Sequence, residues 1–143
     1  MTNQDKFIFN PAIPSAVLPE IQKHLFTYAW LIPGWCQRIF IEWSSESDGL
    51  GAMCSNSQYE YRQVTLTFYP CWHTRTEPEK QQMVIHELLH SFSDPLYDYS
   101  LEIIKSLLPE SESPTFRENA LRELTKHNES FIQDLSYCIL NNN

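Results

Sequence analysis

The stretch that decides the fold runs from residue 84 to residue 90 and reads VIHELLH. It contains the pattern H-E-x-x-H, formed by His86, Glu87 and His90. Residues four apart in an α-helix lie on nearly the same face, so the two imidazoles can converge on one metal ion. Glu87 is placed to reach a water activated by that ion rather than the ion itself. The segment therefore predicts a helix that carries a catalytic zinc site.

The residues before this pattern predict the helix independently. Thr76 can cap a helix, Glu79 completes a capping box three residues later, and Pro78 is tolerated in the first turn. The pattern itself is expected roughly 0.015 times by chance in a chain of this length and composition. We expect this helix to run to about Phe92, and a second helix to run from about Leu96 to Leu108.

The remaining segments predict a small sheet and further helices. Apolar residues at three- and four-residue steps predict helices over 15–32 and 115–140, and alternating residues predict strands over 36–43 and 59–69. The polar stretches 44–57 and 110–114 are expected to be a loop and a linker, and residues 1–13 an irregular lead-in. The expected class is α+β, a small antiparallel sheet packed on the H-E-x-x-H helix and further helices.

Composition limits the domain number and the partners. The chain has 143 residues, 42% of them hydrophobic, which is enough for one domain spanning residues 1–143. Ten Lys and Arg against eighteen Asp and Glu give a net charge of −8. An acidic chain of this kind disfavours nucleic-acid binding, which normally requires a basic patch. Only three glycines are present, which disfavours glycine-rich phosphate loops.

The expected compartment is the cytoplasm. No run of about 18 apolar residues predicts a membrane span, and the first residues do not follow a signal-peptide pattern. The four cysteines are scattered without a C-x-x-C pair, so we expect reduced thiols that pack as small apolar groups.

Residues 86–94, HELLHSFSD, resemble the active-site helix of zincin metallopeptidases, in the H-E-L-x-H-x-x-x-D form of the thermolysin-type gluzincins. The order of elements also resembles small single-domain metallopeptidase-like proteins of bacteria and phages. This resemblance implies a minimal zincin-like fold and a zinc-dependent peptidase. The metzincin branch is excluded, because Ser93 and Leu96 stand where that branch has glycine and histidine.

The resemblance implies a third zinc ligand, a glutamate from a later helix. The best match is Glu129, on the edge of the apolar stripe of the last predicted helix. Its competitors are Glu118, Glu102, Asp94 and His127. Asp94 is expected either to close the helix end or to hold a ligating histidine from outside.

Other parts of the site stay open at this level. The gluzincin pattern places an outer carboxylate four residues after the ligand glutamate, but Gln133 stands there and Asp134 follows it. An oxyanion donor could come from Tyr97, Tyr99, His73 or His127, none of which is singled out. The predicted strand 59–69 is the expected edge strand, along which an extended peptide could add.

Two functions follow. The first is a zinc metallopeptidase that hydrolyses a protein or peptide substrate, with His86, His90 and Glu129 as zinc ligands and Glu87 as the base. Because the chain is short for a peptidase, it could need a partner protein to complete its groove. The alternative is a catalytically weak or inactive zincin-fold module that binds a metal and regulates a protein partner.

Overall fold

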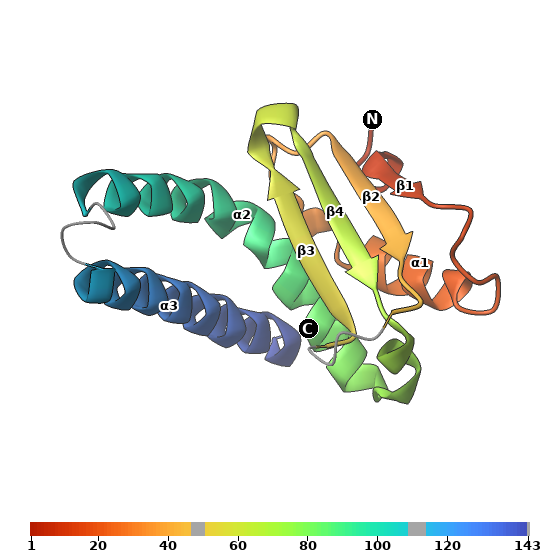
Figure 1. Ribbon diagram of the computed structural model, residues 1–143. Coiled ribbons are helices and arrows are strands. Elements are labelled where there is room, and N and C mark those ends of the chain that lie inside the picture. The colour runs from red at the N-terminus through yellow and green to blue at the C-terminus, as the bar shows by residue number, and fades with distance from the viewer. Residues whose placement is uncertain (47–50, 109–113, 143) are drawn as a thin grey trace.

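The computed structural model describes residues 1–46, 51–108 and 114–142. In this part of the chain a four-stranded sheet packs on α-helices (Figure 1). The α+β class is therefore confirmed. In chain order the strands and α-helices are β1 (Phe7–Phe9), α1 (Leu18–Thr27), β2 (Arg38–Trp43), β3 (Met53–Gln58), β4 (Gln63–Phe68), α2 (Glu77–Leu107) and α3 (Pro114–Asn141).

The sheet is mixed, so the prediction of an antiparallel sheet is wrong. Its strand order is β1-β2-β4-β3, and β1, β2 and β4 run parallel while β3 is antiparallel to β4. The chain leaves β2, forms β3 on the outer edge, and turns back into β4 between them. The polar sequence of β3, MCSNSQ, lacks the apolar alternation of a half-buried strand, which is why the sequence predicts a loop over residues 44–57. With β3 missed, β2 and β4 looked like an antiparallel pair.

The edge strand is β3 and not the predicted strand over residues 59–69. Residues Tyr59–Tyr61 form a 3-10 helix, and Arg62 adopts the left-handed conformation (φ 52°) that reverses the chain into β4. β4 itself is paired on both sides, with β2 and with β3. The short β1 was also missed, because its three residues give too little periodicity.

Helix α2 is continuous where two helices were predicted. Its capping box is confirmed: the backbone N–H of Thr76 donates to Glu79 at 2.7 Å, and the Thr76 hydroxyl at 2.9 Å. Pro95 lies inside the helix and cannot donate to the carbonyl of Ser91. The Trp35 indole donates to that carbonyl instead, at 2.9 Å, and so satisfies the group that the proline leaves free. The helix therefore passes the proline without ending.

The other predicted helices are confirmed with shifted ends. The first is shorter than the predicted 15–32, because a 3-10 helix over Ala29–Leu31 follows α1. The last agrees within one residue at each end. Residues 110–113 of the predicted linker and residues 47–50 of the predicted loop lie outside the described residues.

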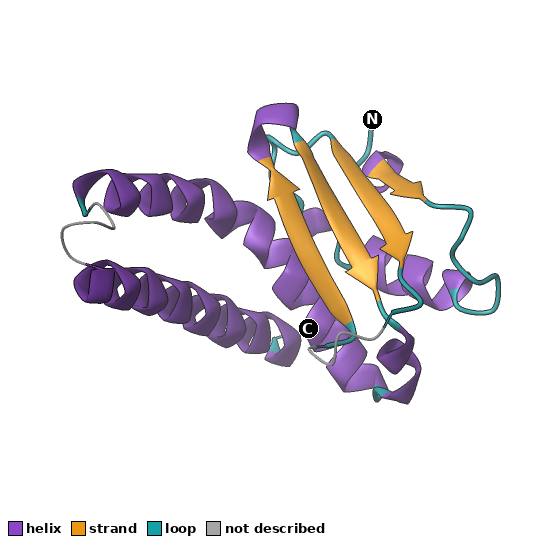
Figure 2. Ribbon diagram, viewed as in Figure 1, coloured by secondary structure: helices purple, strands orange, loops and turns teal. Residues whose placement is uncertain are grey.

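The core lies between one face of the sheet and the helices α1 and α2, which sit on the same side of it (Figure 2). Alternate residues of the strands point into this core, and α3 packs along α2 and contributes a residue of its own. Within the described residues, no helix has the length and apolar content to cross a membrane. The fully buried side chains from the two central strands and from α3 are Ile39, Ile41, Val64, Leu66, Phe68 and Ile132.

Candidate metal centre

The two histidines of the H-E-x-x-H pattern converge on one point. His86 and His90 lie one turn apart on α2, and their Nε2 atoms are 3.2 Å apart. Their side chains are only 16% and 13% exposed. Both nitrogens therefore point to the same small volume, as the sequence predicted.

The neighbouring helix α3 brings Glu129 to the same point. Its Oε2 lies 3.3 Å from Nε2 of His86, and its Oε1 lies 3.4 Å from Nε2 of His90. The structure thus places together the three predicted ligands, from two helices that follow one another in the chain.

Polar contacts on both sides of Glu129 fix the register of α3 on α2. The hydroxyls of Tyr97 and Thr125 are 2.7 Å apart, one turn before Glu129. One turn or more after it, the Gln82 amide donates to Gln133 at 3.1 Å and to Ser136 at 3.0 Å. Gln133, at the position of the outer carboxylate, therefore joins the two helices.

The competing ligands lie elsewhere. His127 is paired with Glu123 at 3.7 Å and its side chain is 78% exposed. Glu102 lies 3.9 Å from Lys105, on its own helix. Among the residues that the structure describes, neither these nor Glu118 joins the cluster of His86, His90 and Glu129.

Asp94 holds His90 from outside. Its Oδ1 lies 3.3 Å from Nδ1 of His90, and α2 continues for more than three turns beyond it, so it does not close the helix. Burial alone would lower the pKa of His90, but the hydrogen bond to Asp94 and the carboxylates of Glu87 and Glu129 raise it. Because Asp94 contacts Nδ1 of His90, the other ring nitrogen, Nε2, points toward His86 and Glu129.

The spacing of the three donors fits a tetrahedral zinc ion. Zinc–nitrogen and zinc–oxygen bonds of 2.0–2.2 Å at tetrahedral angles place ligand atoms about 3.4 Å apart. The observed separations of 3.2, 3.3 and 3.4 Å match this value. Two imidazoles and one carboxylate are also a donor set that zinc accepts.

Glu87 lies beside the centre but is not one of the three donors. The Ser55 hydroxyl of β3 lies on the cleft beside the Glu87 carboxylate, which it can reach by a hydrogen bond. Burial raises the pKa of Glu87, although Ser55 and the two histidines act in the opposite direction. A carboxylate with a raised pKa next to a metal centre is suited to take up and release a proton.

A cleft of about 550 Å³ contains these groups. Its walls are β3, from Cys54 to Ser57, and the helices α2 and α3. Sequence reasoning missed the β3 residues because neither a motif nor apolar periodicity marks them. Of the oxyanion candidates, Tyr97 lines this cleft, whereas the His73 ring packs on Trp43, 5.7 Å between centroids.

A second group, Glu20, His24 and Glu77, also brings donors together. His24 is 2% exposed, and burial lowers its pKa. However, Lys80 binds Glu20 at 2.6 Å and Lys23 binds Glu77 at 3.0 Å. These ammonium groups already compensate both carboxylates, so this group suits a divalent ion less well than the cleft does.

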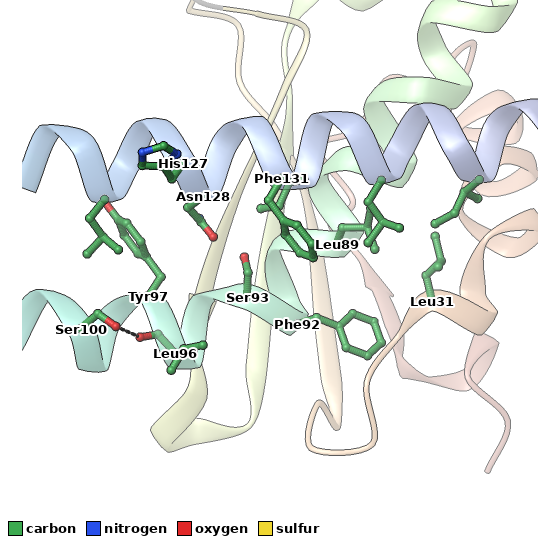
Figure 3. A pocket seen from close by; sticks show the side chains of 14 residues that line it. Leu31, Leu89, Phe92, Ser93, Leu96, Tyr97, Ser100, His127, Asn128 and Phe131 are labelled. Atoms are coloured by element: carbon green, nitrogen blue, oxygen red, sulfur yellow. Dashed lines mark hydrogen bonds between the residues drawn. The ribbon is translucent and has the colours of Figure 1, made fainter.

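An apolar cavity lies on the side of the α2–α3 pair that faces away from the cleft. Figure 3 shows side chains from both helices, among them Phe92 and Phe131, that line it. The cavity has a volume of about 620 Å³, and Phe92, Leu96 and Phe131 line it with exposed fractions of 53%, 71% and 62%. Tyr97 and Asn128 line both this cavity and the cleft, so they separate the two.

Comparison of the chain with protein-family models, with curated proteins and with solved structures finds no match.

Proposed function

We propose that this protein is a zinc-dependent metallopeptidase of the gluzincin type. His86, His90 and Glu129 would hold the zinc ion, and Glu87 would act as the general base. The observation that carries this proposal is the spacing of the three donor atoms, 3.2–3.4 Å, with Glu87 beside them in an open cleft.

Zinc, when bound, supplies a Lewis acid and lowers the pKa of a water toward 7. The residues of the chain supply the rest of the chemistry. Glu87 takes the proton of the attacking water and returns it to the leaving amine, a role that its raised pKa supports. Ser55 keeps the Glu87 carboxylate in place during this transfer. Asp94 keeps His90 in the tautomer that offers Nε2 to the ion.

The proposed substrate is an extended peptide that pairs with the edge strand β3. Among the described residues β3 pairs only with β4, so its other edge is available beside the cleft. Strand addition would use backbone hydrogen bonds and bring a scissile carbonyl next to Ser55 and Glu87. A partner protein could complete the groove, and the cytoplasm stays the expected compartment.

A second candidate is a zincin-fold module that binds a metal and regulates a protein partner. The observation that favours it is the apolar cavity, whose exposed Phe92, Leu96 and Phe131 are typical of an interaction surface. This candidate does not require Glu87 to act as a base.

The substitution Glu87→Gln separates the two functions. We expect one zinc ion per chain, by mass spectrometry, in both wild type and Glu87→Gln, but hydrolysis of a peptide mixture by wild type alone. Removal of a general base lowers the rate by about 10²–10⁴-fold. Glu118→Gln, an exposed change on α3, is the matched control and should keep both properties.

Two results would overturn the proposal. If wild-type protein prepared with zinc in excess retains no zinc, the proposed metal site does not exist. Zinc-loaded wild type that cleaves no peptide in a proteome-derived mixture would favour the regulatory module.

A further inference from the structure

A second cavity continues the cleft along the edge strand. It has a volume of about 400 Å³ and lies where β3 ends. We call it the tyrosine pocket. It shares Ser57 and Asp98 with the cleft, so the two form neighbouring parts of one groove. The residues that line it are Ser57, Gln58, Tyr59, Glu60, Tyr61, Pro95, Asp98, Tyr99 and Glu102.

The tyrosine pocket carries negative charge without a compensating cation inside it. Asp98 and Glu102 lie one turn apart on α2, and Glu60 faces them from the turn after β3. In the part of the chain that the structure describes, no Lys or Arg lines the pocket or the cleft. Lys105 lies on the flank, 3.9 Å from Glu102. Burial, and then the carboxylates of Asp94 and Glu102, raise the pKa of Asp98. A cation in this pocket would relieve the repulsion.

Three tyrosine rings stand among these carboxylates. Tyr59, Tyr61 and Tyr99 are 53%, 65% and 65% exposed. Tyr59 is supported by an edge-on contact with Trp35, 5.1 Å between ring centroids. Aromatic faces attract ammonium and guanidinium groups, most strongly where water is partly excluded. The apolar ring surface would also cover the methylene stem of such a side chain.

An unpaired hydroxyl supports a ligand at the same place. The Oγ atom of Ser57 is buried, and the described part of the chain offers it no hydrogen-bond partner. Ser57 lines both the pocket and the cleft. Its hydroxyl could accept one hydrogen bond from a guanidinium or ammonium group that enters the pocket.

The register of β3 sets the distance between pocket and reaction centre. Ser55, which binds Glu87, and Ser57 point to the same face, because residues two apart in a strand do so. They are separated by about 7 Å along the strand. A peptide paired with this edge, with its scissile carbonyl near Glu87, would bring a side chain about two residues away to the tyrosine pocket.

We propose that the tyrosine pocket is a specificity site that takes a lysine or arginine side chain about two residues from the scissile bond. The substrates would then be basic peptides, which the acidic chain would also attract at long range. This inference rests on the proposed peptidase function.

The experiment measures binding and cleavage separately. A set of alanine-based decapeptides carries one arginine at each position in turn, and a matched set carries citrulline, which has nearly the same shape without the charge. Binding is measured to zinc-loaded Glu87→Gln, which cannot hydrolyse the peptides. Cleavage sites are mapped by mass spectrometry with wild type.

We expect arginine at one or two positions to be favoured over citrulline by about tenfold or more, in binding and in cleavage. Asp98→Asn combined with Glu102→Gln should reduce this ratio to below about twofold. Glu118→Gln combined with Glu123→Gln removes the same charge from exposed positions of α3 and should leave the ratio unchanged. Tyr99→Leu should lower the preference for arginine over citrulline without changing the charge of the pocket.

Each outcome addresses one proposal. Cleavage without an arginine preference, or a preference that the pocket variant keeps, overturns the tyrosine pocket and leaves the peptidase function. Arginine-selective binding to Glu87→Gln without any cleavage by wild type overturns the peptidase function and leaves the pocket as a site for basic peptides.

Discussion

The two sides of the α2–α3 pair differ in chemistry although the same helices build both. The cleft side presents His86, His90 and Glu129, and the residues that line it are mostly polar or acidic. The opposite side presents Phe92 and Phe131 around an apolar cavity. Phe92 follows His90 by only two residues, which turns it about 200° around the helix axis. A two-residue step along α2 therefore separates a surface suited to a chemical reaction from a surface suited to contact with a partner.

The largest expected effect comes from removing a ligand on the cleft side. His90→Ala should weaken zinc binding by more than about a hundredfold, because losing a ligand costs more than the 10–100-fold typical of losing an outer partner. Competition with a chromophoric chelator measures the affinity. Phe92→Ala, on the apolar side of the same helix turn, is the matched control. An equal loss of zinc affinity in His90→Ala and Phe92→Ala would mean that the apolar side contributes to the metal centre as much as the cleft side does.

The next effect concerns the stability of the fold, compared between a buried residue of α3 and an exposed residue on the apolar side. Ile132 is fully buried between α3 and its neighbours, so Ile132→Ala should lower the free energy of unfolding by about 2–5 kcal/mol. The substitution Phe131→Ala, at the exposed neighbouring position, should lower the free energy of unfolding by less than about 1 kcal/mol. Urea unfolding monitored by circular dichroism gives both values. A large loss for Phe131→Ala would show that a partner or a second copy buries that side.

A smaller effect is expected at Asp94. Asp94→Ala removes the contact that orients His90 and should weaken zinc binding by about 10–100-fold. Chelator competition again measures the affinity, with Glu118→Ala, at an exposed carboxylate of α3, as the control. If Asp94→Ala binds zinc as tightly as wild type, the contact does not orient the ligand.

The smallest effect is electrostatic and depends on pH. The folded protein raises the pKa of Asp98, so the folded state holds this proton more tightly than the unfolded state does. The contribution of Asp98 to stability is therefore most favourable at low pH, and it is lost as the pH rises through the raised pKa. Asp98→Asn should raise the melting temperature at pH 7 by no more than a few degrees, and the gain should vanish near pH 3. A gain that persists at pH 3 would contradict this sign.

The cleft side could be predicted from the sequence where a spacing rule applied. The positions of His86 and His90 follow from the helix period. Glu129 was proposed from the resemblance to gluzincins, and the apolar stripe of its helix placed it on an edge that could face a neighbouring helix. The capping box at Thr76 followed from local chemistry. These are features that a few neighbouring residues determine.

The parts that were missed depend on contacts between distant residues. The break predicted between Phe92 and Leu96 does not occur, because the Trp35 indole, 56 positions away from Ser91, satisfies the carbonyl that Pro95 leaves free. The strand β3 forms from polar residues because β4 offers it a hydrogen-bonding edge and α2 covers one of its faces. Sequence periodicity carries no record of such partners, so the antiparallel sheet and the edge strand were predicted wrongly.

The most direct test is a crystal structure of the zinc-loaded protein with diffraction data at the zinc absorption edge. We expect one anomalous peak in the cleft, bonded to Nε2 of His86, Nε2 of His90 and the carboxylate of Glu129, with Glu87 beside the open position. A peak between Glu20, His24 and Glu77 and none in the cleft would contradict this expectation.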